Sequence, residues 1–174
     1  VFFGKPCGLM DQTASAVGNL VTIDFFEKEN PKIEPLTFDF ASCGHALCII
    51  DTQASHADLT DEYAAIPNEI KAVCAYFGKE VLTEIEENEF FKNIPVLREK
   101  CGDRAVLRAI HFYQENARVP KQVEALENGD FEGFLKLIKE SGYSSYMYLQ
   151  NVIPAGYKEH QDVGVALALC EHYL

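Results

Sequence analysis

The spacing of apolar residues changes near residue 55, and no other feature of the chain constrains its fold as strongly. Before this point, residues 33–40 alternate between apolar and polar side chains, which is the period of a half-buried strand. Beyond it, apolar residues recur at the spacing of one helix face, as in residues 63–77. We therefore expect a helix-rich α+β chain in which strands come first and helices follow.

The first part of the chain contains three segments with strand character. Residues 19–26 are rich in β-branched and aromatic side chains, and the turn-forming residues 29–31 separate them from residues 33–40. This order predicts a hairpin. Residues 45–51 form a continuous apolar run that predicts a third, more buried strand. About three antiparallel strands are expected in total.

The second part of the chain predicts five or six helices. Three prolines lie inside the helical stripes and are expected to kink or divide them: Pro67, Pro95 and Pro120. Asp103 and Asp130 precede apolar stretches of helical period and are expected to cap the helices that begin there. Ser141-Gly142 is expected to end one helix before Ser144 or Ser145 opens the next.

The charge balance limits the partners of the chain. Its 27 acidic and 15 basic residues give a net charge of -12, which repels nucleic acid and anionic lipid, so we expect neither as a partner. No apolar run approaches the roughly 20 residues that span a bilayer. The six cysteines form no Cys-x-x-Cys pair and the five histidines are scattered, so we expect no metal site and a reduced, cytoplasmic location.

One short segment near the start carries residues suited to catalysis. Gly8 lets the backbone bend, and Asp11 follows in the expected first turn of a helix. The helix dipole stabilises an ionised carboxylate there, and such a carboxylate can accept the proton of an attacking hydroxyl in phosphoryl transfer. From the residues alone, a cap or a solvated first-turn charge is the more common role for such an aspartate.

The same segment resembles a known family. Residues 6–12, Pro-Cys-Gly-Leu-Met-Asp-Gln, are followed by a small-residue helix and a strand ending in Ile-Asp, which resembles the segment after the ATP loop in galactokinases of the GHMP kinase superfamily. Further segments follow in the family's order: Ile50-Asp51-Thr52, residues 55–59, Glu62-Tyr63, Asp103-Arg104-Ala105, residues 127–131, and Glu140-Ser141 followed by Ser144 or Ser145. The resemblance spans nearly the whole chain.

The resemblance implies that galactose is phosphorylated at its anomeric hydroxyl, with ATP and magnesium. Asp11 matches the family's catalytic base, and Gly8 matches a position whose backbone amide contacts the sugar. Tyr63 matches a tyrosine whose hydroxyl bonds the sugar, although it also fits the apolar stripe of its own helix. In a partial GHMP kinase fold, residues 1–54 would belong to the N-terminal lobe and residues 55–174 to the helical C-terminal lobe.

Several segments of the family are missing from the chain. These are the opening sugar motif, the ATP loop and the glycine-rich segment that closes the site, and both ends of the chain look cut. We therefore expect an internal fragment of a galactokinase that does not phosphorylate galactose alone. No residue of the fragment is expected to bind ATP, magnesium or another metal. The apolar residues 1–3 and 163–174 are expected to favour self-association.

Two departures from the family leave the substrate open. Residues 64–67 occupy the position where the family commonly has an arginine pair, and Ser141-Gly142 occupies the position where the family has Ser-His. A kinase for a related hexose is therefore an alternative. A galactokinase-like sensor that binds sugar and ATP and regulates a partner is a second alternative, and a structural or interaction domain is a third.

Overall fold

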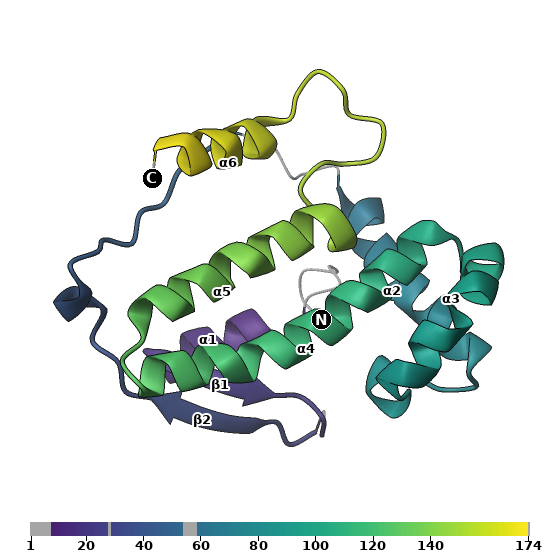
Figure 1. The fold of residues 1–174 in the computed structure, drawn as a ribbon, viewed down its shortest axis with the longest axis horizontal. Coiled ribbons are helices and arrows are strands. Elements are labelled where there is room, and N and C mark those ends of the chain that lie inside the picture. The colour runs from purple at the N-terminus through teal and green to yellow at the C-terminus, as the bar shows by residue number, and fades with distance from the viewer. Residues whose placement is uncertain (1–7, 28, 54–58, 174) are drawn as a thin grey trace.

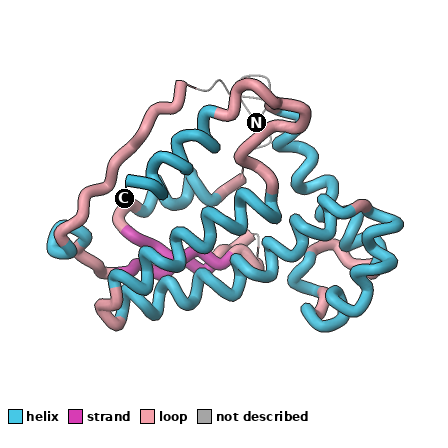
Figure 2. The backbone as a smooth tube through the Cα atoms, turned by 45° about the horizontal axis from the view of Figure 1, so that its top comes forward, coloured by secondary structure: helices cyan, strands magenta, loops and turns pink. Residues whose placement is uncertain are grey.

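The structure of the chain, a computed structural model, describes residues 8–27, 29–53 and 59–173. Within these residues it contains one two-stranded antiparallel sheet and six α-helices. Strands precede most of the helices along the chain, and helices make up most of the fold (Figures 1 and 2). The expected helix-rich α+β class is therefore confirmed, whereas the number of strands is smaller than expected.

The first segment is a short helix followed by a hairpin. Helix α1 (Met10–Val17) leads through Gly18, whose φ angle is positive (73°), into β1 (Leu20–Asp24), which pairs with β2 (Lys32–Leu36). In the register, Leu20 lies opposite Leu36 and Ile23 lies opposite Ile33. The predicted hairpin is confirmed, and the chain reverses direction where the sequence places its turn-forming residues.

The predicted third strand is wrong. Residues 45–51 have no regular secondary structure, with Leu47 99% and Ile49 95% exposed. A strand requires a neighbour that accepts and donates backbone hydrogen bonds, and the described residues offer none to residues 46–50. After the hairpin, the chain continues through a 3-10 turn, Phe40–Cys43. The ring of Phe40 packs against Phe131 and Phe134 of a later helix.

Five further α-helices follow: α2 (Thr60–Tyr76), α3 (Glu87–Cys101), α4 (Asp103–Glu127), α5 (Phe131–Ser144) and α6 (Asp162–Tyr173). Helices α2, α3 and α4 continue through Pro67, Pro95 and Pro120, so these prolines do not divide the helices, and the alternative of a kink stays a prediction. All three prolines are exposed, and water can bind the carbonyl groups that they leave without a partner. None of the described helices is both long and apolar enough to cross a membrane.

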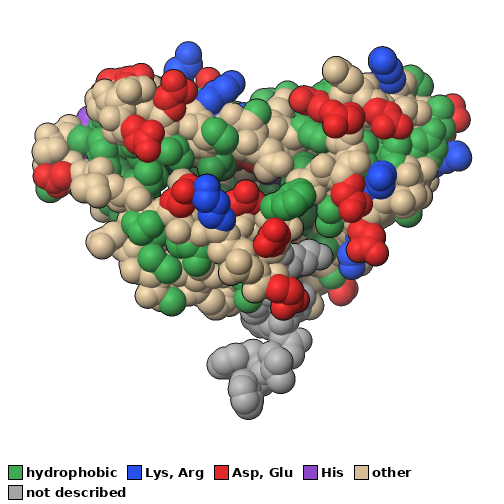
Figure 3. Space-filling view, turned by 90° about the horizontal axis from the view of Figure 1, so that it is seen from below, with side chains coloured by type: hydrophobic (Ala, Val, Ile, Leu, Met, Phe, Trp, Pro, Cys, Tyr) green, Lys and Arg blue, Asp and Glu red, His purple; other side chains and the backbone are tan. Residues whose placement is uncertain are grey.

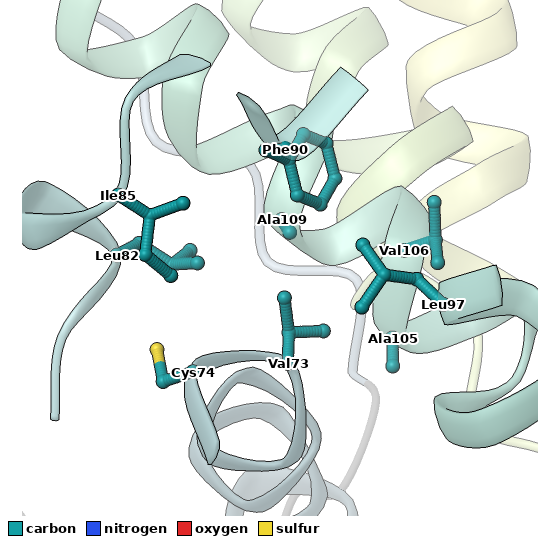
Figure 4. Packing of buried hydrophobic residues seen from close by; sticks show 9 residues of the cluster. All are labelled: Val73, Cys74, Leu82, Ile85, Phe90, Leu97, Ala105, Val106 and Ala109. Carbon is teal, nitrogen blue, oxygen red and sulfur yellow. The ribbon is translucent and has the colours of Figure 1, made fainter. Parts of the chain in front are cut away.

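The core lies where α2, α3 and α4 meet. Figure 4 shows its nine residues: Val73 and Cys74 of α2, Leu82 and Ile85 of the segment between α2 and α3, Phe90 and Leu97 of α3, and Ala105, Val106 and Ala109 of α4. The Tyr113 hydroxyl of α4 donates to the carbonyl oxygens of Leu82 and Ile85, at 3.3 and 3.0 Å. Burial raises the pKa of Tyr113 to about 12. This packing holds the N-terminal half of α4 in place.

The observed ends of α4 and α5 agree only in part with those that the sequence predicts. Asp130 accepts a hydrogen bond from the Gly133 amide at 2.9 Å, so its predicted cap is confirmed. Asp103 does not cap α4, because its carboxylate pairs with Arg98, 2.7 Å away. The expected end of α5 at Ser141-Gly142 is also wrong, since α5 runs to Ser144 and continues as a π-helical turn, Ser145–Leu149.

Polar contacts between α4 and α5 account for this extension. The Ser141 hydroxyl donates to Glu115 at 2.8 Å. The buried Ser144 hydroxyl lies 2.9 Å from Nδ1 of His111 and donates to Gln114 at 3.1 Å. Burial, and the nearby positive charge of Arg118, lower the pKa of His111. The two antiparallel helices are thus joined by hydrogen bonds as well as by apolar contacts (Figure 1).

The surface carries the excess of acidic groups that the sequence indicates. In the face shown in Figure 3, acidic side chains are spread among apolar ones and the basic groups form no continuous patch. Helix α6 contacts α5 through the Lys139–Glu171 pair, at 2.7 Å, and exposes Val165, Leu167 and Leu169. The expected self-association stays a prediction. The expected boundary between the two lobes also stays a prediction, because residues 54–58 lie outside the described residues.

Candidate functional site

A cavity of about 310 Å³ lies between α2, the π-helical turn and the residues that lead into α6. Four neutral amide side chains belong to its polar lining: Gln53, Gln150, Asn151 and Gln161. Its apolar lining comes from Leu59, Ile66, Val152, Ile153, Pro154 and Val163. Amide groups can donate and accept hydrogen bonds at once, so this lining suits a small molecule with many hydroxyl groups.

Two of the lining residues have an uncommon backbone conformation. Gln53 and Gln150 have positive φ angles of 58° and 55°, and among the described non-glycine residues only Asn19 shares this property. The left-handed region disfavours residues that carry a Cβ atom, and such residues concentrate at binding and catalytic sites. The π-helical turn that precedes Gln150 is another feature found frequently at functional sites.

Arg108 of α4 forms the innermost charged part of the cavity wall. Its side chain is only 1% exposed. Nε donates to the carbonyl oxygen of Leu149 at 3.0 Å, and Nη1 donates to the carboxylate of Glu69 at 2.9 Å. Burial lowers the pKa of Arg108, but an arginine keeps its charge at neutral pH. One guanidinium thus joins α4, α2 and the end of the π-helical turn.

Arg104 extends this network toward the solvent. It lies one turn before Arg108 on α4 and donates from Nε to Glu69 at 2.9 Å, a bond that raises the pKa of Arg104. Its Nη1 lies 3.8 Å from the carboxylate of Glu62. Glu62 lines the cavity and accepts a hydrogen bond from the Ala155 amide at 3.3 Å. Two arginines of α4 and two glutamates of α2 therefore form one connected set.

Tyr63 lines the cavity, and its side chain is 60% exposed. The stripe to which the sequence assigns it is buried only farther along α2, at Val73 and Cys74. Tyr63 lies in the first turn of the helix, beyond the end of the core, so its ring is not a core residue. This position allows a ligand to reach the ring, and the sugar-binding role of Tyr63 stays a prediction.

Asp11 and Gly8 lie elsewhere. Asp11 is exposed in the first turn of α1, and neither residue lines the Tyr63 cavity or the hollow beside β1 and β2. A Cβ atom at Gly8 would meet nothing within 4 Å, so space does not require a glycine there. Within the described residues, the structure does not bring Asp11 and Tyr63 into one cavity. Their roles stay predictions.

The described residues provide no candidate metal centre, because no group of three His, Cys, Asp or Glu side chains is arranged to hold an ion. Two segments of the resemblance, residues 6–7 and 55–58, lie outside the described residues.

The sequence analysis missed Arg108 and Glu69. A signal was present, because Arg104 and Arg108 are four residues apart, and Glu62 and Glu69 are seven residues apart. Both spacings place like charges on one helix face, and each face needs an oppositely charged partner when it is buried. The pairing itself depends on how α2 and α4 cross, which the spacing does not specify.

Comparison with known proteins identifies similar chains. The galactokinase of Thermotoga neapolitana is 29% identical over 160 residues, which cover 91% of this chain and 41% of that protein. The galactokinase of Actinobacillus pleuropneumoniae serotype 5b is 30% identical over 74% of this chain and 33% of its own length, and that of Streptomyces coelicolor is 29% identical over 75% and 33%. No protein-family profile matches the chain. The chain thus spans about two fifths or less of the length of these relatives.

Proposed function

We propose, on the premise that this chain is a homologue of galactokinases along most of its length, that it forms part of a sugar kinase. The proposed reaction transfers the γ-phosphoryl group of the substrate ATP to the anomeric hydroxyl of galactose. The observation that carries the proposal is the order of the shared segments along the chain, together with a cavity that Tyr63 lines. In the proposed fold, residues 1–54 and 55–174 belong to two lobes of a GHMP kinase.

The chemistry of the cavity supports a neutral sugar as its ligand. Its lining combines amides, the rings of Tyr63, Tyr157 and His160, and apolar side chains. Its one arginine is already bonded to Glu69 and Leu149. The acidic side chains Glu62 and Asp162 add negative charge to the lining. A polyphosphate would meet repulsion there, whereas sugar hydroxyls can bond to amides and carboxylates. We propose that the Tyr63 hydroxyl bonds one of the sugar hydroxyls.

Asp11 is the proposed catalytic base, which accepts the proton of the anomeric hydroxyl as the sugar oxygen attacks phosphorus. Its exposed position in the first turn of α1 leaves the carboxylate accessible to a substrate, and the Gly8 amide is proposed to contact the same sugar. Because Asp11 does not line the Tyr63 cavity, the proposal requires a longer protein to bring both to one sugar. Among the described residues, no group of three His, Cys, Asp or Glu side chains could hold a metal ion, and we assign no residue to ATP or magnesium.

The test uses the protein expressed from the complete gene, with ADP release measured in the presence of galactose and of related hexoses. The unaltered protein should phosphorylate galactose, and the 174-residue chain alone should not. Asp11→Asn should lower kcat by about a hundredfold or more, because it removes the general base and keeps the shape of the side chain. A loss of less than about threefold would remove Asp11 from the mechanism.

The outcome for the unaltered protein separates the remaining interpretations. Turnover of another hexose in place of galactose would support a related sugar kinase. Binding of galactose and ATP without turnover would support a sensor. Absence of both binding and turnover would refute the proposed function.

A further inference from the structure

Five consecutive residues, 150–154, all line the cavity. They form one wall of it, and they contain the left-handed Gln150. A segment without regular secondary structure usually moves more than the helices around it. Here the residues on both sides of the segment are bonded to charged side chains of α2 and α4, so its position depends on those two helices.

The first anchor is Arg108. Its Nε donates to the Leu149 carbonyl oxygen at 3.0 Å, directly before the wall begins. This carbonyl is at the end of the π-helical turn, where the chain no longer supplies a regular helical partner. A hydrogen bond from a buried cation is stronger than one between neutral groups. The bond therefore fixes the point at which the chain leaves the helix.

The second anchor is Glu62. Its carboxylate accepts a hydrogen bond from the Ala155 amide at 3.3 Å, directly after the wall ends. Glu62 is adjacent to Tyr63 in the first turn of α2. The carboxylate that holds the wall and the phenol proposed to bind the sugar thus come from neighbouring positions of one helix.

The two anchors are connected to each other. Arg108 bonds Glu69 at 2.9 Å, Arg104 bonds the same carboxylate at 2.9 Å, and Arg104 lies 3.8 Å from Glu62. The order Arg108, Glu69, Arg104, Glu62 alternates in charge from one end of the wall to the other. Movement of one anchor therefore changes the electrostatic environment of the other.

We propose that Arg108 and Glu62 are positioning residues that hold residues 150–154 as a sugar-binding wall opposite Tyr63. The proposal rests on the proposed function, because it assigns the cavity to the sugar. It places Gln150 and Asn151 among the groups that contact sugar hydroxyls. Loss of either anchor should weaken sugar binding and leave the phosphoryl-transfer step nearly unchanged, since neither anchor is proposed to contact the reacting atoms.

The test compares four variants. Arg108→Lys keeps the charge beside Glu69 but cannot reproduce the fixed two-nitrogen geometry toward Glu69 and Leu149. Glu62→Leu removes the acceptor for the Ala155 amide, whereas Glu62→Gln keeps a carbonyl oxygen in its place. Arg98→Lys is the matched control, because it makes the same change at an exposed arginine that pairs with Asp103 and lies outside the network of the two anchors.

Two measurements are made on each variant. Amide hydrogen exchange of residues 150–153 and of Ala155 is followed in the 174-residue chain, because Pro154 has no amide hydrogen. KM for galactose and kcat are measured in the protein from the complete gene. Arg108→Lys and Glu62→Leu should each raise the exchange rate and KM by about tenfold, the effect of losing one hydrogen bond to a charged group, with kcat within about threefold. Glu62→Gln and Arg98→Lys should stay within about threefold of the unaltered protein in all three quantities.

Each result decides a separate question. Unchanged exchange in Arg108→Lys and Glu62→Leu would show that the two anchors do not hold residues 150–154 in place and would overturn the proposal, whatever the activity. Faster exchange with an unchanged KM would show that the wall does not contact the sugar and would overturn the positioning role. If the unaltered protein does not phosphorylate galactose, the proposed function fails. The positioning role is then judged by galactose binding in calorimetry, where an unchanged or undetectable affinity would overturn it.

Discussion

The cap of α5 leads to a prediction in which one substitution has different effects in two backgrounds. Asp130 accepts a hydrogen bond from the Gly133 amide at 2.9 Å. A Cβ atom at Gly133 would lie 2.2 Å from Oδ2 of Asp130 and 2.7 Å from its Cγ. These distances are too short for contact, so Gly133→Ala forces the carboxylate to rotate away. The alanine and the cap therefore compete for the same space.

The magnitudes follow from two opposing effects. Alanine is more favourable than glycine in a helix by about 1 kcal/mol, and loss of an aspartate cap costs about 1 kcal/mol. Gly133→Ala should thus leave the free energy of unfolding nearly unchanged in the unaltered protein. In an Asp130→Ala background the cap is already lost, so the same substitution should stabilise the protein by about 1 kcal/mol. The expected coupling between the two sites is about 1 kcal/mol.

Urea unfolding followed by far-ultraviolet circular dichroism measures these differences in a double-mutant cycle. Gly142→Ala is the control, because Gly142 lies in the same helix and nothing is within 4 Å of its Cβ position. It should stabilise both backgrounds by about 1 kcal/mol. If Gly133→Ala stabilises the unaltered protein as much as Gly142→Ala does, the carboxylate does not compete with the methyl group and the reasoning is wrong.

Four further outcomes are expected. Phe90→Ala should destabilise the fold by about 3–5 kcal/mol because Phe90 is fully buried, whereas Phe91→Ala, at the exposed neighbouring residue, should cost less than about 1.5 kcal/mol in urea unfolding. The folded protein disfavours protonated His111, so stability should fall as pH drops below about 6.5 in the unaltered protein, and this fall should be smaller in His111→Gln. Gly8→Ala should leave the unfolding midpoint unchanged, since the space around Gly8 is open; a shift of several degrees would contradict this. Leu167→Lys on the exposed face of α6 should lower any concentration-dependent rise in the light-scattering mass, and a constant monomer mass in the unaltered chain would refute self-association.

Local patterns in the sequence were sufficient for several parts of the fold. The hairpin forms where alternating segments flank turn-forming residues, and the Asp130 cap forms between residues three apart. Both depend on segments close together in the sequence, with the paired hairpin residues at most 16 positions apart, as in Leu20 and Leu36, so the amino-acid pattern contains the necessary information. The same holds for the shared segments that indicated the relationship to galactokinases, because motif order is a property of the chain alone.

Other features required contacts between distant segments. The apolar run at residues 45–51 indicated a strand, but a strand also needs a partner, and the described residues supply none. Three prolines indicated kinks or breaks, yet the helices continue because each proline faces solvent while the opposite side of the helix packs. The spacing of apolar residues indicates which secondary structure a segment can form, but it does not indicate which other segments will pack against it.

The candidate site shows this division most clearly. The sequence singled out Glu62-Tyr63 by motif, and the structure places both residues at the cavity. Arg108 was missed, because its role depends on Leu149, 41 residues away, and on Glu69, 39 residues away. A side chain's chemistry and its place on a helix are local properties that composition and spacing specify. Which charges meet depends on how whole helices cross, because long-range packing selects one pairing from many that the same sequence pattern allows.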